Sequence, residues 1–138
     1  MSDGVLTGGC QCGAVRYRVK GPVEDIYHCH CAMCRRLQGA LFGTYASYRE
    51  ENFDLTTPEA DLATYDSSPG THRLFCKACG CNILGRADGM PGQVYVSVAT
   101  LDGGAAPEGY REKLHHIFVG SKVPWYPLRD GLPQREEY

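Results

Sequence analysis

The segment His28-Cys29-His30-Cys31-Ala32-Met33-Cys34 places three thiols in one short stretch, and the rest of the chain must fold around it. Closely spaced thiolates can converge on one cation, and zinc is the metal that such sulfur-rich clusters most often hold. Three protein ligands leave a fourth position for water or a substrate, which is the usual arrangement of a reactive zinc. The spacing therefore predicts a reactive zinc at Cys29, Cys31 and Cys34.

Two cysteine pairs flank this segment, at Cys10-Gln11-Cys12 and at Cys76-Lys77-Ala78-Cys79. In an extended segment residues i and i+2 share a face, so the thiols of the first pair can bind one ion together. The second pair, with Gly80 after it, has the form of a zinc knuckle, in which a tight turn brings two sulfurs together. The pairs predict a closed structural zinc site, and hence two zinc ions per chain, with the ligands Cys10, Cys12, Cys76 and Cys79.

The cysteines also admit two other interpretations. An even number of thiols is compatible with a disulfide framework, although cysteines one residue apart pair with difficulty and no export signal is visible. Cys81 lies just beyond the knuckle and could be a fourth ligand that closes the central site, which would make both zinc ions structural. Alternatively, Cys81 is a small buried residue without a ligand role.

The histidines near these clusters have simpler roles available to them. His28 and His30 alternate with Cys29 and Cys31, so in an extended segment they face away from a metal held by those sulfurs. Packing or surface hydrogen bonding is then expected for both. His115 or His116 could instead reach the open zinc position from another strand.

Short β-type runs set the expected fold class. Residues 14–19 alternate, with Val15, Tyr17 and Val19 on one face and arginines on the other, which is typical of a half-buried strand. No window sustains helical apolar spacing over three turns, and the other β-rich runs are residues 25–29, 41–46, 62–65, 72–76, 82–85, 94–98 and 116–119. We expect one mainly β domain over residues 1–138, in which 127–138 form a polar surface tail.

Charge and hydropathy exclude several classes of protein. The formal net charge of −2 over 138 residues provides no general attraction to nucleic acid or to anionic membranes. The amino terminus resembles no secretory signal, and no apolar stretch approaches the length of a membrane helix. A reducing, cytoplasmic location is therefore expected, without nucleic-acid or membrane partners.

Trp125-Tyr126 is expected to anchor the core where the chain turns, or else to form an aromatic wall of a ligand pocket.

Two stretches carry a family resemblance: Gly8-Gly9-Cys10-Gln11-Cys12-Gly13-Ala14-Val15-Arg16-Tyr17 and Cys29-His30-Cys31-Ala32-Met33-Cys34-Arg35-Arg36-Leu37-Gln38-Gly39-Ala40. Together with Phe75-Cys76-Lys77-Ala78-Cys79-Gly80 and the ending 116–126, they resemble the glutathione-dependent formaldehyde-activating enzyme family, which also includes centromere protein V. The resemblance implies a small fold of two packed sheets, shared with a Rab-associated zinc protein. It also implies the same division of ligands between a structural and a reactive zinc.

The activity implied by the resemblance joins formaldehyde to glutathione, and the reverse reaction is that of a carbon–sulfur lyase. Partners would be glutathione or a related thiol and a small aldehyde. Arg35 and Arg36 could neutralise the excess charge of three thiolates, and these two or Arg73 could bind a substrate carboxylate, although a surface position is the default for each. The alternative is a non-catalytic zinc-stabilised binding module, as a resemblance to centromere protein V suggests.

Overall fold

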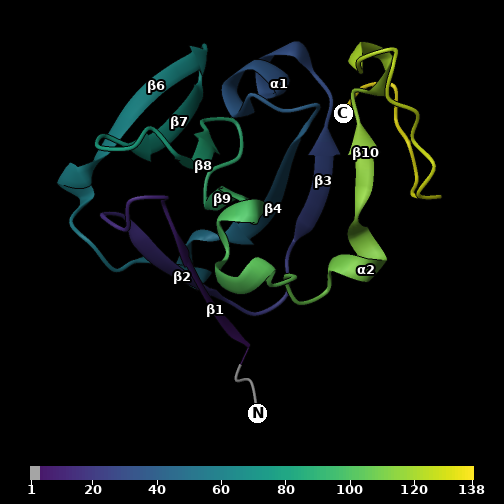
Figure 1. Cartoon of the computed structure of the whole chain (residues 1–138). Coiled ribbons are helices and arrows are strands. Elements are labelled where there is room, and N and C mark those ends of the chain that lie inside the picture. Colours follow the sequence, from purple (N-terminus) through teal and green to yellow (C-terminus); the bar gives the residue numbers. More distant parts are fainter. Residues whose placement is uncertain (1–3) are drawn as a thin grey trace.

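The computed structural model describes residues 4–138 and contains two β-sheets joined by short helices (Figure 1). The smaller sheet has the order β1-β2-β5, with strands Val5–Gly9, Arg16–Lys20 and Phe53–Leu55. The larger sheet has the order β10-β3-β4-β9-β8-β7-β6. Its strands are, in chain order, Asp25–Cys29, Gly43–Arg49, Leu62–Ser68, Thr71–Cys76, Asn82–Ala87, Gln93–Ser97 and His115–Ile117. The prediction of a mainly β fold with two sheets is confirmed.

The helices are short. The α-helices are α1, Ala32–Gln38, and α2, Tyr110–Lys113; the 3-10 turns are Glu50–Asn52, Glu59–Asp61, Val98–Thr100, Asp102–Gly104 and Val119–Ser121. Helix α1 follows β3 closely because Cys31 is extended and its thiol accepts a hydrogen bond from the Cys34 N–H. Gly39 ends the helix in the left-handed conformation, at φ 60°. Within residues 4–138, no helix is long and apolar enough to cross a membrane.

Strand β2 contains most of the alternating run 14–19, and its burial pattern explains which side chains face the core. Tyr17 and Val19 are each 1% exposed, whereas Arg18 lies on the outer face. Tyr17 stacks on Phe53 of the neighbouring strand β5, with 5.4 Å between the ring centroids. Burying side chains of this size stabilises a fold by about 1.5–3 kcal/mol each, so alternation fixes which face of the strand points inward.

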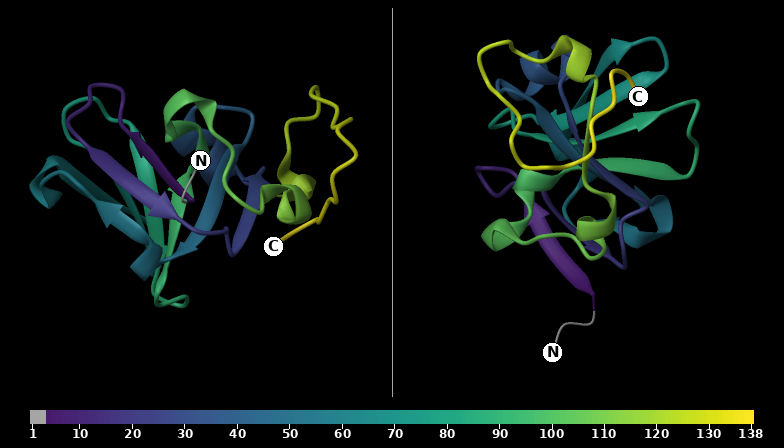
Figure 2. Two further views of the ribbon diagram at one scale, coloured as in Figure 1. Left: turned by 90° about the horizontal axis from the view of Figure 1, so that it is seen from below. Right: turned by 90° about the vertical axis from the view of Figure 1, so that its right-hand side faces the viewer.

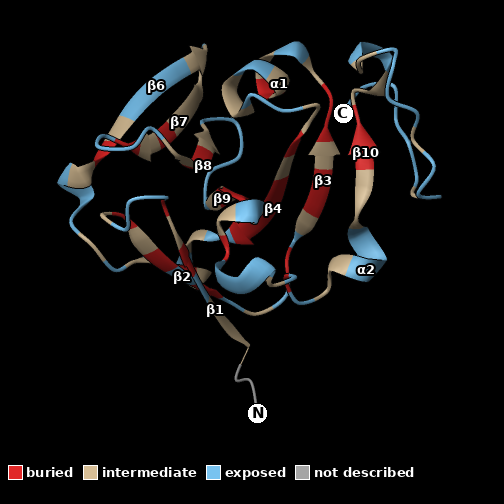
Figure 3. Cartoon of the chain, viewed as in Figure 1, coloured by how far each residue is buried: buried red, intermediate tan, exposed pale blue. Residues whose placement is uncertain are grey.

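Buried side chains form two clusters. The larger cluster lies where the small sheet packs on the large one and includes Tyr17, Tyr48 and Ile83. The smaller cluster lies on the large sheet around Tyr27, Tyr45 and Ile117, and it includes Cys29 and Cys34. Figure 3 shows many buried positions along β3 and β4, while α2 is mostly exposed and β6 is mostly intermediate or exposed. The second cluster positions the central cysteines.

The C-terminal residues run back along β10. The His116 N–H donates to the carbonyl of Pro133, and the Arg135 N–H donates to the carbonyl of His116, both at 2.9 Å. The right-hand view of Figure 2 shows this segment in yellow beside β10. Trp125 is 69% exposed, so the prediction that it anchors the core is wrong. Its side chain lies in the connection that leads away from β10 before the chain returns.

Candidate metal centres and the adjoining pocket

Four cysteine sulfurs from the two sheets meet at one point. Cys10 and Cys12 lie between β1 and β2, while Cys76 ends β7 and Cys79 follows it. All four sulfurs lie within 4.8 Å of one another. The Cys12 sulfur is 3.6 Å from that of Cys10 and 3.7 Å from that of Cys76. Tetrahedral zinc with Zn–S bonds of about 2.3 Å sets neighbouring sulfurs about 3.8 Å apart, whereas a disulfide requires about 2 Å. The spacing fits a zinc ion.

The local backbone supports this group, called here the outer cluster (Cys10, Cys12, Cys76 and Cys79). The Val15 N–H donates to the Cys10 sulfur at 3.3 Å. Burial acts to raise the pKa of Cys10, but this hydrogen bond and the neighbouring thiols outweigh it and lower that pKa to about 6. The pKa of Cys12 is instead raised to about 12, because its neighbours outweigh a hydrogen bond from the Ala14 backbone. Four adjacent thiolates therefore need a cation to form together.

Three further sulfurs form the central cluster (Cys29, Cys31 and Cys34). Cys29 ends β3, Cys31 caps α1 and Cys34 lies in the first turn of α1. Their sulfurs lie within 4.8 Å of one another, and among residues 4–138 no histidine, carboxylate or further cysteine joins the group. Cys29 and Cys34 are 3% and 4% exposed, while Cys31 is half-buried. The arrangement offers three ligands to a metal and leaves one side of the group without a protein ligand.

The electrostatics of the central cluster also call for a cation. A hydrogen bond from the Cys29 thiol, then the Cys31 thiol and the charge of Arg73, lower the pKa of Cys34 to about 5 against the opposing effect of burial. The same contact with Cys34, followed by burial, raises the pKa of Cys29. One thiolate is therefore stabilised while the next is disfavoured, and a dication would remove this conflict.

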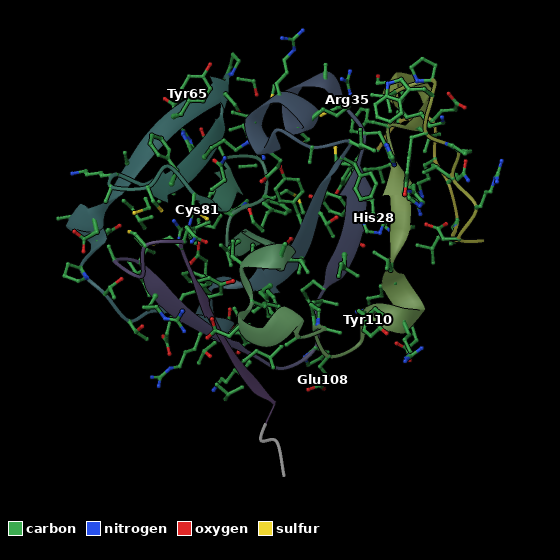
Figure 4. All side chains as sticks on the ribbon, viewed as in Figure 1. His28, Arg35, Tyr65, Cys81, Glu108 and Tyr110 are labelled. Carbon is green, nitrogen blue, oxygen red and sulfur yellow. The ribbon has the colours of Figure 1, made fainter. Side chains whose placement is uncertain are left out.

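Cys81 lies apart from the central cluster. Its half-buried side chain packs against the larger core cluster, and its thiol contacts the carbonyl of Asn82 at 3.8 Å. The Cys76 N–H donates to the carbonyl of Cys81 at 3.0 Å, which holds Cys81 next to the knuckle. Figure 4 shows Cys81 well away from Arg35, which marks α1. The geometry does not support the alternative in which Cys81 closes the central site.

The central cluster forms part of the wall of a pocket of about 350 Å³. Aromatic side chains make up much of the rest of the wall, namely Tyr27, Tyr45, Tyr95, Phe118 and Tyr138. Two arginines also line it, Arg73 from β7 and Arg86 from β8. A pocket of this size beside a three-sulfur group can bring a small organic molecule to the metal position.

The arginine that faces the cluster differs from those expected to neutralise it. Arg35 donates from Nε to the carbonyl of His30 at 3.3 Å and Arg36 is exposed, and neither lines the pocket. Arg73 instead lies over the Tyr45 ring, with its guanidinium carbon 5.6 Å from the ring centroid, and its charge acts on Cys34. The geometry therefore does not support the expectation that Arg35 and Arg36 neutralise the three thiolates or bind a substrate carboxylate.

Residues 5–121 match the model of the glutathione-dependent formaldehyde-activating enzyme family. The chain belongs to this family. A provisionally named family protein of Colletotrichum graminicola is 28% identical over 125 residues, which cover 88% of this chain and 63% of that protein. A relative with the same provisional name from Aspergillus flavus is 29% identical over 79 residues, which cover 57% of this chain and 41% of that protein. The chain thus spans less than two thirds of these curated relatives.

A crystal structure of a Rhodobacter sphaeroides protein is similar in fold to this member of the formaldehyde-activating family. The TM-score is 0.62 and the sequence identity 27%, and the match covers 79% of this chain and 98% of the other. The likeness therefore extends over nearly the whole of that protein. It leaves about a fifth of the present chain without a counterpart there.

In this family member, two buried histidines and an aspartate form a chain of hydrogen bonds that the sequence does not predict. His30 Nε2 lies 2.8 Å from His116 Nδ1, and His116 Nε2 lies 2.8 Å from Asp130 Oδ2. His28 Nδ1 lies 2.6 Å from Thr44 Oγ1. These contacts agree with the packing role expected of His28 and His30, and they do not support His116 as a ligand. The only available signal was the position of His30 between two cysteines, because Asp130 lies in the segment expected to be a tail.

Proposed function

We propose that the chain is a zinc-dependent carbon–sulfur lyase that interconverts a thiol and a small aldehyde with their S-hydroxyalkyl adduct. Glutathione, or a related thiol, and formaldehyde are the substrate pair that the family name suggests. The observation that carries the proposal is a three-sulfur group in the wall of a pocket, with no fourth protein ligand among the described residues.

The two clusters would have different tasks. Zinc held by the outer cluster would link the small sheet to β7 of the large sheet and so stabilise the fold. Zinc held by the central cluster would lower the pKa of an incoming thiol and neutralise the surrounding thiolates. Both tasks require reduced cysteines, so we propose that the protein acts in a reducing compartment such as the cytoplasm.

The residues of the pocket would bind and orient the reactants. The substrate thiol releases its proton to water and its thiolate attacks the aldehyde carbon, a carbon–sulfur bond forms as the carbonyl π bond breaks, and the electron pair that moves to oxygen takes a proton back from water. Tyr45 lines the pocket and would donate a hydrogen bond to that oxygen, since burial raises the pKa of its hydroxyl and keeps it protonated. The Gln38 side chain donates to the Tyr45 oxygen at 3.1 Å and holds the ring in place. Holding both reactants in one pocket removes part of the entropic barrier.

Cobalt substitution separates this proposal from the alternative of a non-catalytic binding module. The full chain is loaded with Co²⁺ and titrated with glutathione while the thiolate-to-cobalt absorption is followed. An open central site predicts that the absorption changes on titration, with saturation. Two closed sites predict an unchanged spectrum, and that result would contradict the proposal.

Exchange NMR at equilibrium tests catalysis itself, because thiols also add to formaldehyde without a catalyst. The exchange rate between free formaldehyde and its glutathione adduct is measured with wild-type protein, with Cys31→Ser and with the matched control Cys81→Ser. We expect wild type and Cys81→Ser to accelerate exchange and Cys31→Ser to leave the background rate. Equal rates for all three samples and for buffer would exclude the lyase activity.

A further inference from the structure

The pocket beside the central cluster has walls that suit one kind of ligand. The Tyr27 ring centroid lies 6.0 Å from that of Tyr45 and 6.3 Å from that of Tyr138, so three rings form a continuous wall. Among the described residues, no aspartate or glutamate lines the pocket. Such a wall favours an apolar or aromatic ligand and provides no carboxylate that could pair with an ammonium group.

The two arginines of the pocket differ in what already neutralises them. Arg86 is ion-paired with Glu50 through Nε, and its second nitrogen donates to Glu50 Oε2 at 3.2 Å. Arg73 donates from Nε to Ser67 Oγ at 3.1 Å, and another of its nitrogens contacts Met33 Sδ at 3.6 Å. No ion pair joins Arg73 to a carboxylate in the described part of the chain.

Arg73 already interacts with the Cys34 sulfur, but no carboxylate of the described residues pairs with it, so its remaining N–H groups are available for an anion from outside the protein. Its side chain is only partly exposed, so the guanidinium has lost part of its hydration and an anion bound beside it, in addition to the Cys34 sulfur, would compensate for that loss. Its guanidinium lies above the Tyr45 ring, at the edge of the aromatic wall. A carboxylate bound there would accept paired hydrogen bonds while the rest of the ligand covers the rings.

We propose that the pocket selects a thiol, or its aldehyde adduct, with an aromatic body and a single carboxylate that binds Arg73. This substrate class rests on the proposed function, since it places the sulfur beside the central cluster. Glutathione fits less well, because it carries two carboxylates and an ammonium group for which the pocket has no acidic partner. The competing explanation is that Arg73 serves only to neutralise the three thiolates.

The test compares four thiols on the cobalt-loaded full chain: para-(mercaptomethyl)benzoate, benzyl mercaptan, para-(mercaptomethyl)benzylamine and glutathione. Dissociation constants come from the thiolate-to-cobalt absorption. We expect the benzoate to bind at least about tenfold tighter than each of the other three, because hydrogen bonds to a charged group contribute that much. Arg73→Gln should bring the benzoate to within about threefold of benzyl mercaptan. Arg36→Gln removes the same charge from an exposed position outside the pocket and should leave the preference intact.

Each result decides between explanations. Equal affinities for the four thiols, or a benzoate preference that survives Arg73→Gln, would overturn the proposed substrate class while leaving an open central site in place. Loss of cobalt from Arg73→Gln, together with a preference for the benzoate that the calorimetry described below finds unchanged, would assign Arg73 to charge neutralisation and would also overturn the proposed substrate class. Arg73→Lys, which keeps the charge, should retain part of the preference and guards against a folding defect in the glutamine variant.

A second measurement does not depend on the metal. Calorimetry compares para-ethylbenzoate with para-ethylbenzylamine, neither of which contains sulfur. We expect the benzoate to bind at least about tenfold tighter, with the difference lost in Arg73→Gln. If no thiol alters the cobalt spectrum but the benzoate still binds through Arg73, the proposed function fails and the ligand class of the pocket stands. If the amine binds as tightly as the benzoate, the ligand class fails.

Discussion

His30 Nε2 lies 2.8 Å from His116 Nδ1, and both side chains are 1% exposed. The carboxylate of Asp130 accepts from His116 Nε2, so His116 Nδ1 is left to accept from His30 Nε2. Burial, and then the repulsion that a protonated His116 would exert, lower the pKa of His30 to about 4, which keeps its ring neutral. The chain of contacts joins the segment between Cys29 and Cys31 to β10 and to the C-terminal residues.

Removing His116, the middle residue of these hydrogen bonds, should lower both the stability of the fold and the affinity of the central cluster for metal. His116→Ala leaves His30 Nε2 buried without a partner, which we expect to lower the free energy of unfolding by about 2–4 kcal/mol. Urea denaturation at fixed free zinc measures the change, and metal analysis should show that the central ion is lost before the outer one. His115→Ala, at the half-buried neighbouring position, is the control, with an expected loss below about 1 kcal/mol. Equal losses of unfolding free energy for the two variants would contradict a structural role for the hydrogen bonds that join His30, His116 and Asp130.

The outer cluster should contribute more to stability than a lone cysteine close to it. Cys76→Ser removes a fully buried ligand candidate, and we expect the bound zinc to fall by one ion and the free energy of unfolding to fall by at least about 3 kcal/mol. Cys81→Ser should keep the metal content of the wild type, because its sulfur belongs to neither cluster. Elemental analysis and thermal unfolding of protein purified without chelator check both expectations. Metal loss from Cys81→Ser would show that the ligand set is wrong.

Gly9 should not tolerate a side chain. A Cβ at this position would lie 2.4 Å from the carbonyl oxygen of Val15, a backbone atom that cannot move aside without breaking the turn that carries Cys10. We expect Gly9→Ala to lower the free energy of unfolding by about 1–3 kcal/mol or more. Gly89→Ala is the matched control, because nothing lies within 4 Å of its Cβ position. Chemical denaturation of the two variants should separate them clearly, and similar midpoints would refute the close approach.

His72 should make stability depend on pH. Hydrogen bonds to Asp66 and then to Asp88 raise the pKa of His72 above its ordinary value, at nitrogen–oxygen distances of 2.7 and 2.8 Å. The stabilisation is fully present below the unfolded pKa of about 6.5 and is lost as pH rises through the higher pKa of the folded state. Wild type should therefore exceed His72→Gln in urea midpoint at low pH, with the difference shrinking above about pH 6.5. A difference in urea midpoint that grows with pH would contradict a raised pKa for His72.

Local features of the sequence predicted much of the fold. The alternation at Tyr17 and Val19 predicts the buried face of β2, because successive side chains of a strand point to opposite faces whatever lies around them. The three thiols of the central cluster likewise meet through the geometry of one strand end and one helical turn. Trp125 shows the limit of such reasoning, since an aromatic residue beside a proline carries no local signal of whether another layer covers it.

By itself, the sequence determined the cysteine groupings within each short segment and the alternation of its strands, because bond geometry and chain direction suffice for contacts a few residues apart. Tertiary structure alone decided that Arg73 rather than Arg35 faces the central cluster, that Cys81 stays beside the knuckle, and that Asp130 reaches His116. These contacts depend on the order of strands in the larger sheet and on the return of the chain along β10. Spacing along the chain carries no information about either.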